Sequence, residues 1–235
     1  MDDASLDGAV ALITGASSAI GTATAKRLAG QGAAVSLVSQ PSERSELVAG
    51  EIVRTGGHAV AVAGDITHED GAYGVVQDTL ERFGRLDILV HNASVMLLNS
   101  ALHTTLEDWD QMIAHNITAL LHVTHAAVPY LIDAAITSPR QVADLVAISS
   151  TAAREARPGS SVYTLTMVGV TGFSEALRQE LLSEHVRVSV LQPDTVDTEL
   201  MAEDVADAIT YIVTRERRVA VDQMLVRAGE QLGTG

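Results

Sequence analysis

The 235-residue sequence contains no cysteine, which excludes disulfide bridges and thiolate metal sites. Basic residues are also few: 15 lysines and arginines stand against 30 acidic residues, and Lys26 is the only lysine. Because phosphate-rich partners require clustered positive charge, the net charge of −15 argues against nucleic acid and anionic membranes as partners. We interpret the acidity as a feature that serves solubility.

Targeting signals and repeats are missing as well. Residues 1–5 are acidic and precede no apolar segment of the signal-peptide type. We find no apolar run of membrane-spanning length and no internal period. We therefore expect a cytoplasmic, soluble protein. With 47% hydrophobic residues, the chain is long enough for one large domain with a substantial core.

Apolar runs typical of strands alternate with helical segments along the chain. Strands are expected at residues 8–14, 33–39, 58–63, 86–90, 142–148, 186–191 and 223–226. Helices are expected at 20–31, 41–55, 69–83, 106–136, 161–184 and 203–213, with breaks in the fourth near Asn116 and Pro129. This alternation predicts an α/β fold over residues 1–235: a single Rossmann-like, doubly wound parallel sheet of about seven strands, with helices on both faces.

A glycine loop follows the first predicted strand, at residues 14–21. Glycine lets the backbone approach a pyrophosphate at the positive end of the next helix; a tight turn without a ligand is the alternative. Ala19 stands where a middle glycine would be expected, so binding requires a negative φ there. The loop residues that we assign to cofactor binding are Gly15, Ser17, Ser18, Ile20 and Gly21.

The end of the second predicted strand indicates the type of cofactor. A carboxylate at this point would bind the ribose 2′-hydroxyl of NAD. Ser39 and Gln40 stand there instead, and Arg44 is the nearest arginine. The sequence therefore favours NADP(H) over NAD(H).

A serine and a tyrosine, Ser150 and Tyr163, lie thirteen residues apart between an apolar strand and a helix. Such a hydroxyl pair could transfer a proton at a carbonyl. A cation one helical turn after the tyrosine would lower its pKa. Met167 occupies that position, and a thioether carries no charge. Lys26 cannot substitute, because its helix follows the glycine loop and we expect it at the surface.

Taken in order, these motifs resemble the short-chain dehydrogenase/reductase family along nearly the whole chain. The loop 14–21 is similar to TGxxxGxG, residues 91–94 to NNAG, and residues 193–198 to PGxVxT. The resemblance implies three catalytic residues, Asn116, Ser150 and Tyr163. Beyond the loop, the expected cofactor-binding residues are Ser39, Asp65, Ile66, Asn92, Ala93, Pro193, Val196 and Thr198.

The resemblance also implies a mechanism. The tyrosine gives a proton to the substrate carbonyl, the nicotinamide gives hydride, the serine binds the carbonyl and the asparagine holds a water. A lysine in the family's YxxxK motif grips the ribose, and here Met167 replaces it. Ala19 and Ser94 are further departures, and Asp194 replaces the glycine of PGxVxT. Asp194 is either a neutral loop substitution or a carboxylate that favours the oxidised nicotinamide.

Three functions remain open from the sequence. The first is NAD(P)(H)-dependent reduction of a small-molecule carbonyl, or oxidation of an alcohol, with weakened catalysis. The second is non-redox chemistry (dehydration, isomerisation or cyclisation) by Tyr163 and Ser150, which needs no cofactor. The third is a non-catalytic subunit that partners an active relative.

Two further expectations concern assembly and metals. The helices at 106–136 and 161–184 resemble those that join subunits in the family, so a homodimer or homotetramer is expected. His122 and His125 share a helix face, but no third ligand accompanies them, and no metal site is predicted. His91, beside the expected cofactor, is the histidine of greatest interest.

Overall fold

The computed structural model describes residues 5–194, 199–227 and 229. Its strands are β1 (Val10–Thr14), β2 (Ala34–Ser39), β3 (His58–Ala63), β4 (Ile88–His91), β5 (Ala143–Ile148), β6 (Val186–Pro193) and β7 (Gln223–Val226). Its α-helices are α1 (Ala19–Gly30), α2 (Glu43–Arg54), α3 (Glu69–Phe83), α4 (Leu106–Ile113), α5 (Ala119–Thr137), α6 (Ser161–Glu180) and α7 (Glu199–Val213). Three short helical turns complete the described elements: η1 (Ala114–Thr118), η2 (Thr151–Ala153) and η3 (Leu182–Glu184).

All seven strands form one parallel sheet in the order β3-β2-β1-β4-β5-β6-β7. This topology confirms the predicted doubly wound α/β fold. The chain builds the sheet outward from β1 to β3, then returns to place β4 on the other side of β1. In such a sheet, the carboxyl ends of β1 and β4 separate around a crevice, where this fold class binds ligands.

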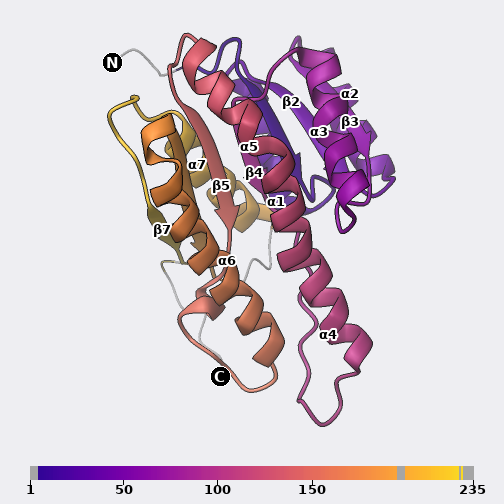
Figure 1. Ribbon diagram of the computed structural model, residues 1–235. Coiled ribbons are helices and arrows are strands. Elements are labelled where there is room, and N and C mark those ends of the chain that lie inside the picture. The colour runs from indigo at the N-terminus through magenta and orange to yellow at the C-terminus, as the bar shows by residue number, and fades with distance from the viewer. Residues whose placement is uncertain (1–4, 195–198, 228, 230–235) are drawn as a thin grey trace.

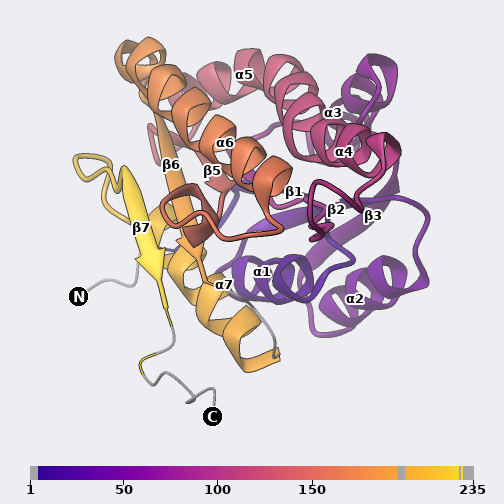
Figure 2. The ribbon, with the colours of Figure 1, turned by 90° about the horizontal axis from the view of Figure 1, so that it is seen from below.

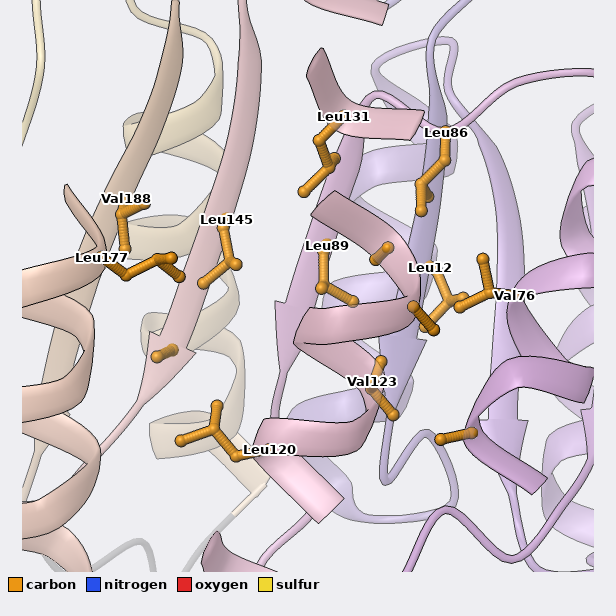
Figure 3. Close-up of a cluster of buried hydrophobic side chains, with 14 of the residues drawn as sticks. Leu12, Val76, Leu86, Leu89, Leu120, Val123, Leu131, Leu145, Leu177 and Val188 are labelled. Carbon is orange, nitrogen blue, oxygen red and sulfur yellow. The ribbon is translucent and has the colours of Figure 1, made fainter. Parts of the chain in front are cut away.

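Helices cover both faces of the sheet, as Figure 2 shows from the side toward which β5 points in Figure 1. The helices α3, α5 and α6 lie on one face, and α1, α2 and α7 lie on the other. Each layer encloses its own aliphatic core. On the α5 face, Leu120, Val123 and Leu131 lie over Leu89 of β4 and Leu145 of β5 (Figure 3). Burial on both faces explains why the strands read as continuous apolar runs.

Helix bounds agree closely with the prediction, with two exceptions, at Pro129 and at the start of α7. The expected break near Asn116 is real, because the π-helix η1 separates α4 from α5. The expected break at Pro129 is wrong: α5 continues through it, since packing against α3 and the sheet outweighs one missing hydrogen bond. The last long helix, α7, begins at Glu199, four residues earlier than the predicted Glu203.

The helical stretch Leu106–Thr137 is long and apolar enough to cross a membrane by length and composition. This finding corrects the expectation that no apolar run reaches membrane-spanning length. Half of its most apolar window is buried within the protein, and the core helices of soluble proteins pass the same test. Its α5 part packs against α3 and the strands β4 and β5, whereas α4 extends past the end of the sheet in Figure 1. We therefore interpret it as a core helix.

Buried ion pairs stabilise the amino ends of the central strands, opposite the crevice. Asp144 of β5 is fully buried and accepts hydrogen bonds from Arg140 and Arg187, both at 2.7 Å. Asp87, just before β4, accepts two bonds from Arg85, also at 2.7 Å. Each buried carboxylate is thus matched by at least one guanidinium, as burial of a charge requires. Because these ion pairs lie opposite the crevice, we interpret them as stabilising the fold and not as part of the active site.

Candidate active site

A crevice of about 400 Å³ opens at the carboxyl ends of the first four strands. It brings together residues that the sequence places as far apart as Gly15 and Ala93. Nine of the residues predicted to bind the cofactor line it: Gly15, Ser17, Ser18, Ile20, Ser39, Asp65, Ile66, Asn92 and Ala93. Their common location supports the predicted grouping, while their contacts with a cofactor stay a prediction.

Two glycines of the loop are required by close packing. Gly15 has a φ of +63°, and a Cβ there would lie 2.7 Å from the Cα of Ala93. A Cβ on Gly21 would lie 2.5 Å from the carbonyl oxygen of Gly15. Any side chain at either position would displace backbone. Gly21 does not line the crevice, so its role is to let α1 pack against the loop.

Ala19 causes no conflict at the middle of the loop. It is the first residue of α1, and among the described residues only Gln141 and His185 combine a side chain with a positive φ. The Ser18 hydroxyl accepts the N–H of Gly21 at 3.1 Å. The N–H groups of Ala19 and Ile20 find no acceptor within the described chain, as is usual in a first helical turn. These free donors at a helix N-terminus fit a diphosphate.

Asn92 fixes the loop from the opposite side of the crevice. Its amide nitrogen lies 2.9 Å from the carbonyl oxygen of Gly15, 3.2 Å from that of Thr14 and 3.0 Å from the Ser18 hydroxyl. The Thr14 hydroxyl in turn accepts the N–H groups of Asn92 and Ala93, both at 3.1 Å. Because the Asn92 amide bonds to the glycine loop itself, we interpret its role as positioning that loop.

The end of β2 offers neither a carboxylate nor a guanidinium to the crevice. The Ser39 hydroxyl lies 2.8 Å from the carbonyl oxygen of Gln40 and 2.9 Å from the hydroxyl of Ser45. Arg44, the nearest arginine in sequence, is exposed and does not line the crevice. At the end of β3, hydrogen bonds from Thr67 hold the pKa of the Asp65 carboxyl below its ordinary value.

The two predicted catalytic hydroxyls, of Ser150 and Tyr163, form a hydrogen bond. Ser150 follows β5 and caps η2, where its hydroxyl accepts the N–H of Ala152 at 3.1 Å. Tyr163 lies in the first turn of α6. Burial raises the pKa of Tyr163, and a hydrogen bond with Ser150 acts in the opposite direction. The phenol is therefore protonated at neutral pH and can serve as a proton donor.

Met167, one turn after Tyr163, is only 1% exposed and packs into the core. It lines a small cavity of about 10 Å³ that adjoins the crevice, and no lysine or arginine is among the described residues around this cavity. Lys26 lies at the surface, as predicted, with its amine 2.7 Å from Glu51. His91 also lines the cavity, with Nε2 2.9 Å from the Thr124 hydroxyl. Burial lowers the His91 pKa to about 3, so it supplies no charge.

Asn116 is buried in η1, and all the N–H groups of its amide are used. Its Oδ1 accepts the N–H of Val95 at 2.7 Å. Its Nδ2 donates to the carbonyl of Val95 at 2.9 Å and to the Thr166 hydroxyl at 3.0 Å. The side chain thus joins the loop after β4 to α6. No N–H is left for the water that the family resemblance implied.

Asp194 has a structural role that the sequence did not reveal. Its Oδ1 accepts the hydroxyl of Thr151, the neighbour of Ser150, at 3.0 Å. The preceding residue, Pro193, ends β6 and is buried. Val196 and Thr198, also predicted to bind the cofactor, lie outside the described residues. Asp194 therefore helps to position the loop that carries the catalytic serine.

Replacing Asp194 with alanine is expected to lower the free energy of unfolding by about 1–3 kcal/mol, because the Thr151 hydroxyl loses a charged acceptor. Urea unfolding followed by circular dichroism measures this change. The matched control, Asp194→Asn, keeps an acceptor oxygen and should lose less than half as much. Equal losses in the two variants would show that the hydrogen bond to Thr151 is not the cause.

Comparison with known proteins agrees with the fold. The family model for short chain dehydrogenases matches residues 9–208. The chain therefore belongs to the short-chain dehydrogenase/reductase family of oxidoreductases, as the motifs indicated.

Among the similar proteins, a 3-oxoacyl-[acyl-carrier-protein] reductase of Synechocystis is 32% identical over 209 residues, covering 88% of this chain and 82% of the relative. A metagenomic short-chain oxidoreductase, solved in complex with NADP, has a TM-score of 0.87 and 32% identity, covering 96% of this chain and 99% of that one. A 3-ketoacyl-(acyl-carrier-protein) reductase of Brucella melitensis, complexed with NADH, has a TM-score of 0.87 and 30% identity, covering 96% and 99%.

Proposed function

We propose that this protein is an NADP(H)-dependent reductase of a small-molecule carbonyl with weakened cofactor grip. The observation that carries the proposal is the hydrogen bond between Tyr163 and Ser150, although neither residue lines the crevice itself. Tyr163 lies one turn before Met167, whose cavity shares four lining residues with the crevice. The shared residues are Ile66, Ala93, Ser94 and His115.

The side chains support reduction better than oxidation. When bound, the nicotinamide would supply hydride to the carbonyl carbon. Tyr163 donates its phenolic proton to the carbonyl oxygen, which becomes the hydroxyl of the product, and the phenolate regains a proton from solvent. Ser150 donates a hydrogen bond that holds the same oxygen. The raised pKa of Tyr163 keeps the donating form present, whereas alcohol oxidation needs the ionised form, which is scarce at neutral pH.

The preference for NADP(H) rests on the end of β2. An NAD site of this fold class uses a carboxylate there to bind the ribose 2′-hydroxyl, and Ser39 and Gln40 provide none. A 2′-phosphate would therefore face no negatively charged side chain at the end of β2. The solved relatives include one complex with NADP and one with NADH, which supports a nicotinamide cofactor of either type.

Titration with NADPH and NADH tests the proposal. We expect protein-bound nicotinamide fluorescence to report NADPH binding below millimolar concentration, and weaker binding of NADH. NADPH consumption would then be screened with small ketones, aldehydes and 3-oxoacyl thioesters. Absence of NADPH binding at millimolar levels would refute the proposal. Turnover of a hydroxyacyl substrate without any nicotinamide would instead support non-redox chemistry by Tyr163 and Ser150.

A further inference from the structure

The described lining of the crevice contains no lysine or arginine to balance the charge of a dinucleotide. A diphosphate carries two negative charges, and NADP adds a third phosphate. Among the described residues that line the crevice there is neither lysine nor arginine, and Asp65 adds a carboxylate. The whole chain carries a net charge of −15. The free N–H groups of α1 provide only partial charges, so a side chain able to carry a full positive charge would matter here.

His115 is the one described lining residue able to carry such a charge. It lies in η1 and lines both the crevice and the small cavity beside Met167. Its Nδ1 lies 3.0 Å from the carbonyl oxygen of Gln111. Since a carbonyl can only accept, Nδ1 is the donor, and Nε2 is the nitrogen that gains or loses the proton.

Two consecutive residues of η1 serve different purposes, because neighbouring side chains on a helix do not share a face. Asn116 is buried and reaches Val95 and Thr166. The preceding His115 is only partly buried and reaches the crevice. The His115 ring thus lies at the crevice where the cofactor is expected.

We propose that protonated His115 is the cation of this cofactor crevice. It provides a positive charge near the cofactor, which Met167, in place of the family's lysine, does not. The affinity for a nicotinamide dinucleotide then falls as His115 loses its proton. This inference rests on the proposed function, because it assumes that a nicotinamide dinucleotide binds. It adds a pH dependence and a specific residue to that function.

The charged and titratable groups around His115 are consistent with this role. Asp65, at the end of β3, also lines the crevice, and its carboxylate lies 3.3 Å from His68. His91, at the end of β4, is neutral. From α6, the uncharged side chains of Met167 and Val170 line the shared cavity, and Tyr163 lies one turn away and is protonated. Asp110 of α4 is exposed and lies nearly a turn and a half before His115.

Calorimetric titration with NADP⁺ and with NAD⁺ at pH 6.0 and pH 8.5 tests the proposal. NAD⁺ is included because it lacks the 2′-phosphate, which itself titrates near pH 6. For the wild-type protein, we expect the Kd of both cofactors to rise about tenfold between the two pH values, the size of one charge-assisted hydrogen bond. His115→Gln should bind weakly at both pH values, and His115→Arg tightly at both. Tighter cofactor binding by His115→Arg than by the wild type at pH 8.5 cannot arise from misfolding, because misfolding would weaken binding.

His125→Gln serves as the matched control, because His125 is exposed on α5 and does not line the crevice. It should keep the wild-type pH dependence. Binding by His115→Gln that equals the wild type at both pH values would overturn the proposal while leaving the reductase function intact. Absence of NADP⁺ and NAD⁺ binding to the wild type at either pH would overturn both.

Discussion

Replacing Tyr163 with phenylalanine is expected to lower kcat for NADPH-dependent carbonyl reduction by about 10²–10⁴-fold, the contribution of a positioned general acid. The phenol is the proton donor in the proposed reaction, and its raised pKa keeps it protonated. Phenylalanine preserves the ring that packs against the core and removes only the hydroxyl. Initial rates at saturating NADPH measure the change.

The pH dependence of the same reaction gives a second measure. The active form of Tyr163 is the protonated one, which is present below its pKa. Because burial moves that pKa above the ordinary value of about 10, reduction should not be limited by this group from neutral pH up to pH 10. The rate of reduction should fall only at still higher pH, where Tyr163 loses its proton.

Two controls separate chemistry from folding. Tyr73 is half-exposed on α3, away from Ser150, and Tyr73→Phe should retain wild-type kcat. The Kd of NADPH should be unchanged in Tyr163→Phe, since the substitution removes no group from the lining of the crevice. If Tyr163→Phe kept wild-type kcat, Tyr163 would not be the acid and the proposed mechanism would be wrong.

The fold could be predicted because its signals are local. Continuous apolar runs mark strands buried on both faces, and glycine or a polar cap marks the helix ends, so β3, β7 and α3 match their predicted bounds. The error at Pro129 has a tertiary cause. Propensity describes an isolated helix, whereas α5 is held by its packing against α3 and the sheet.

The candidate site was only partly predictable. The spacing of Ser150 and Tyr163 signalled their meeting, because one follows a strand and the other lies in the first turn of the next long helix. The roles of Asn116 and Asp194 depend on partners distant in sequence. Asn116 bonds to residues 21 and 50 positions away, and Asp194 bonds to Thr151, 43 positions away. The sequence gives no sign that His115 lines the crevice, because this depends on where the helix packs against the strand ends.

Replacing Met167 with lysine is expected to raise the rate of alcohol oxidation by about 100–1,000-fold at neutral pH, since lowering the pKa of Tyr163 by two or three units increases its ionised fraction by that factor. Reduction uses the protonated phenol and should change less. The lysine stem would replace the buried thioether and extend its amine toward the crevice through the lining that the cavity shares with it. Oxidation of a secondary alcohol with NADP⁺ measures the effect.

Met167→Leu is the matched control, because it preserves apolar packing without charge and should show no gain in oxidation. The lysine variant also bears on His115. A permanent cation at residue 167 would take over the charge that we assign to protonated His115. Cofactor affinity in Met167→Lys should therefore vary less between pH 6.0 and pH 8.5 than in the wild type. A folded Met167→Lys variant with no gain in oxidation would contradict the view that a missing cation limits this site, and would favour chemistry that does not need one.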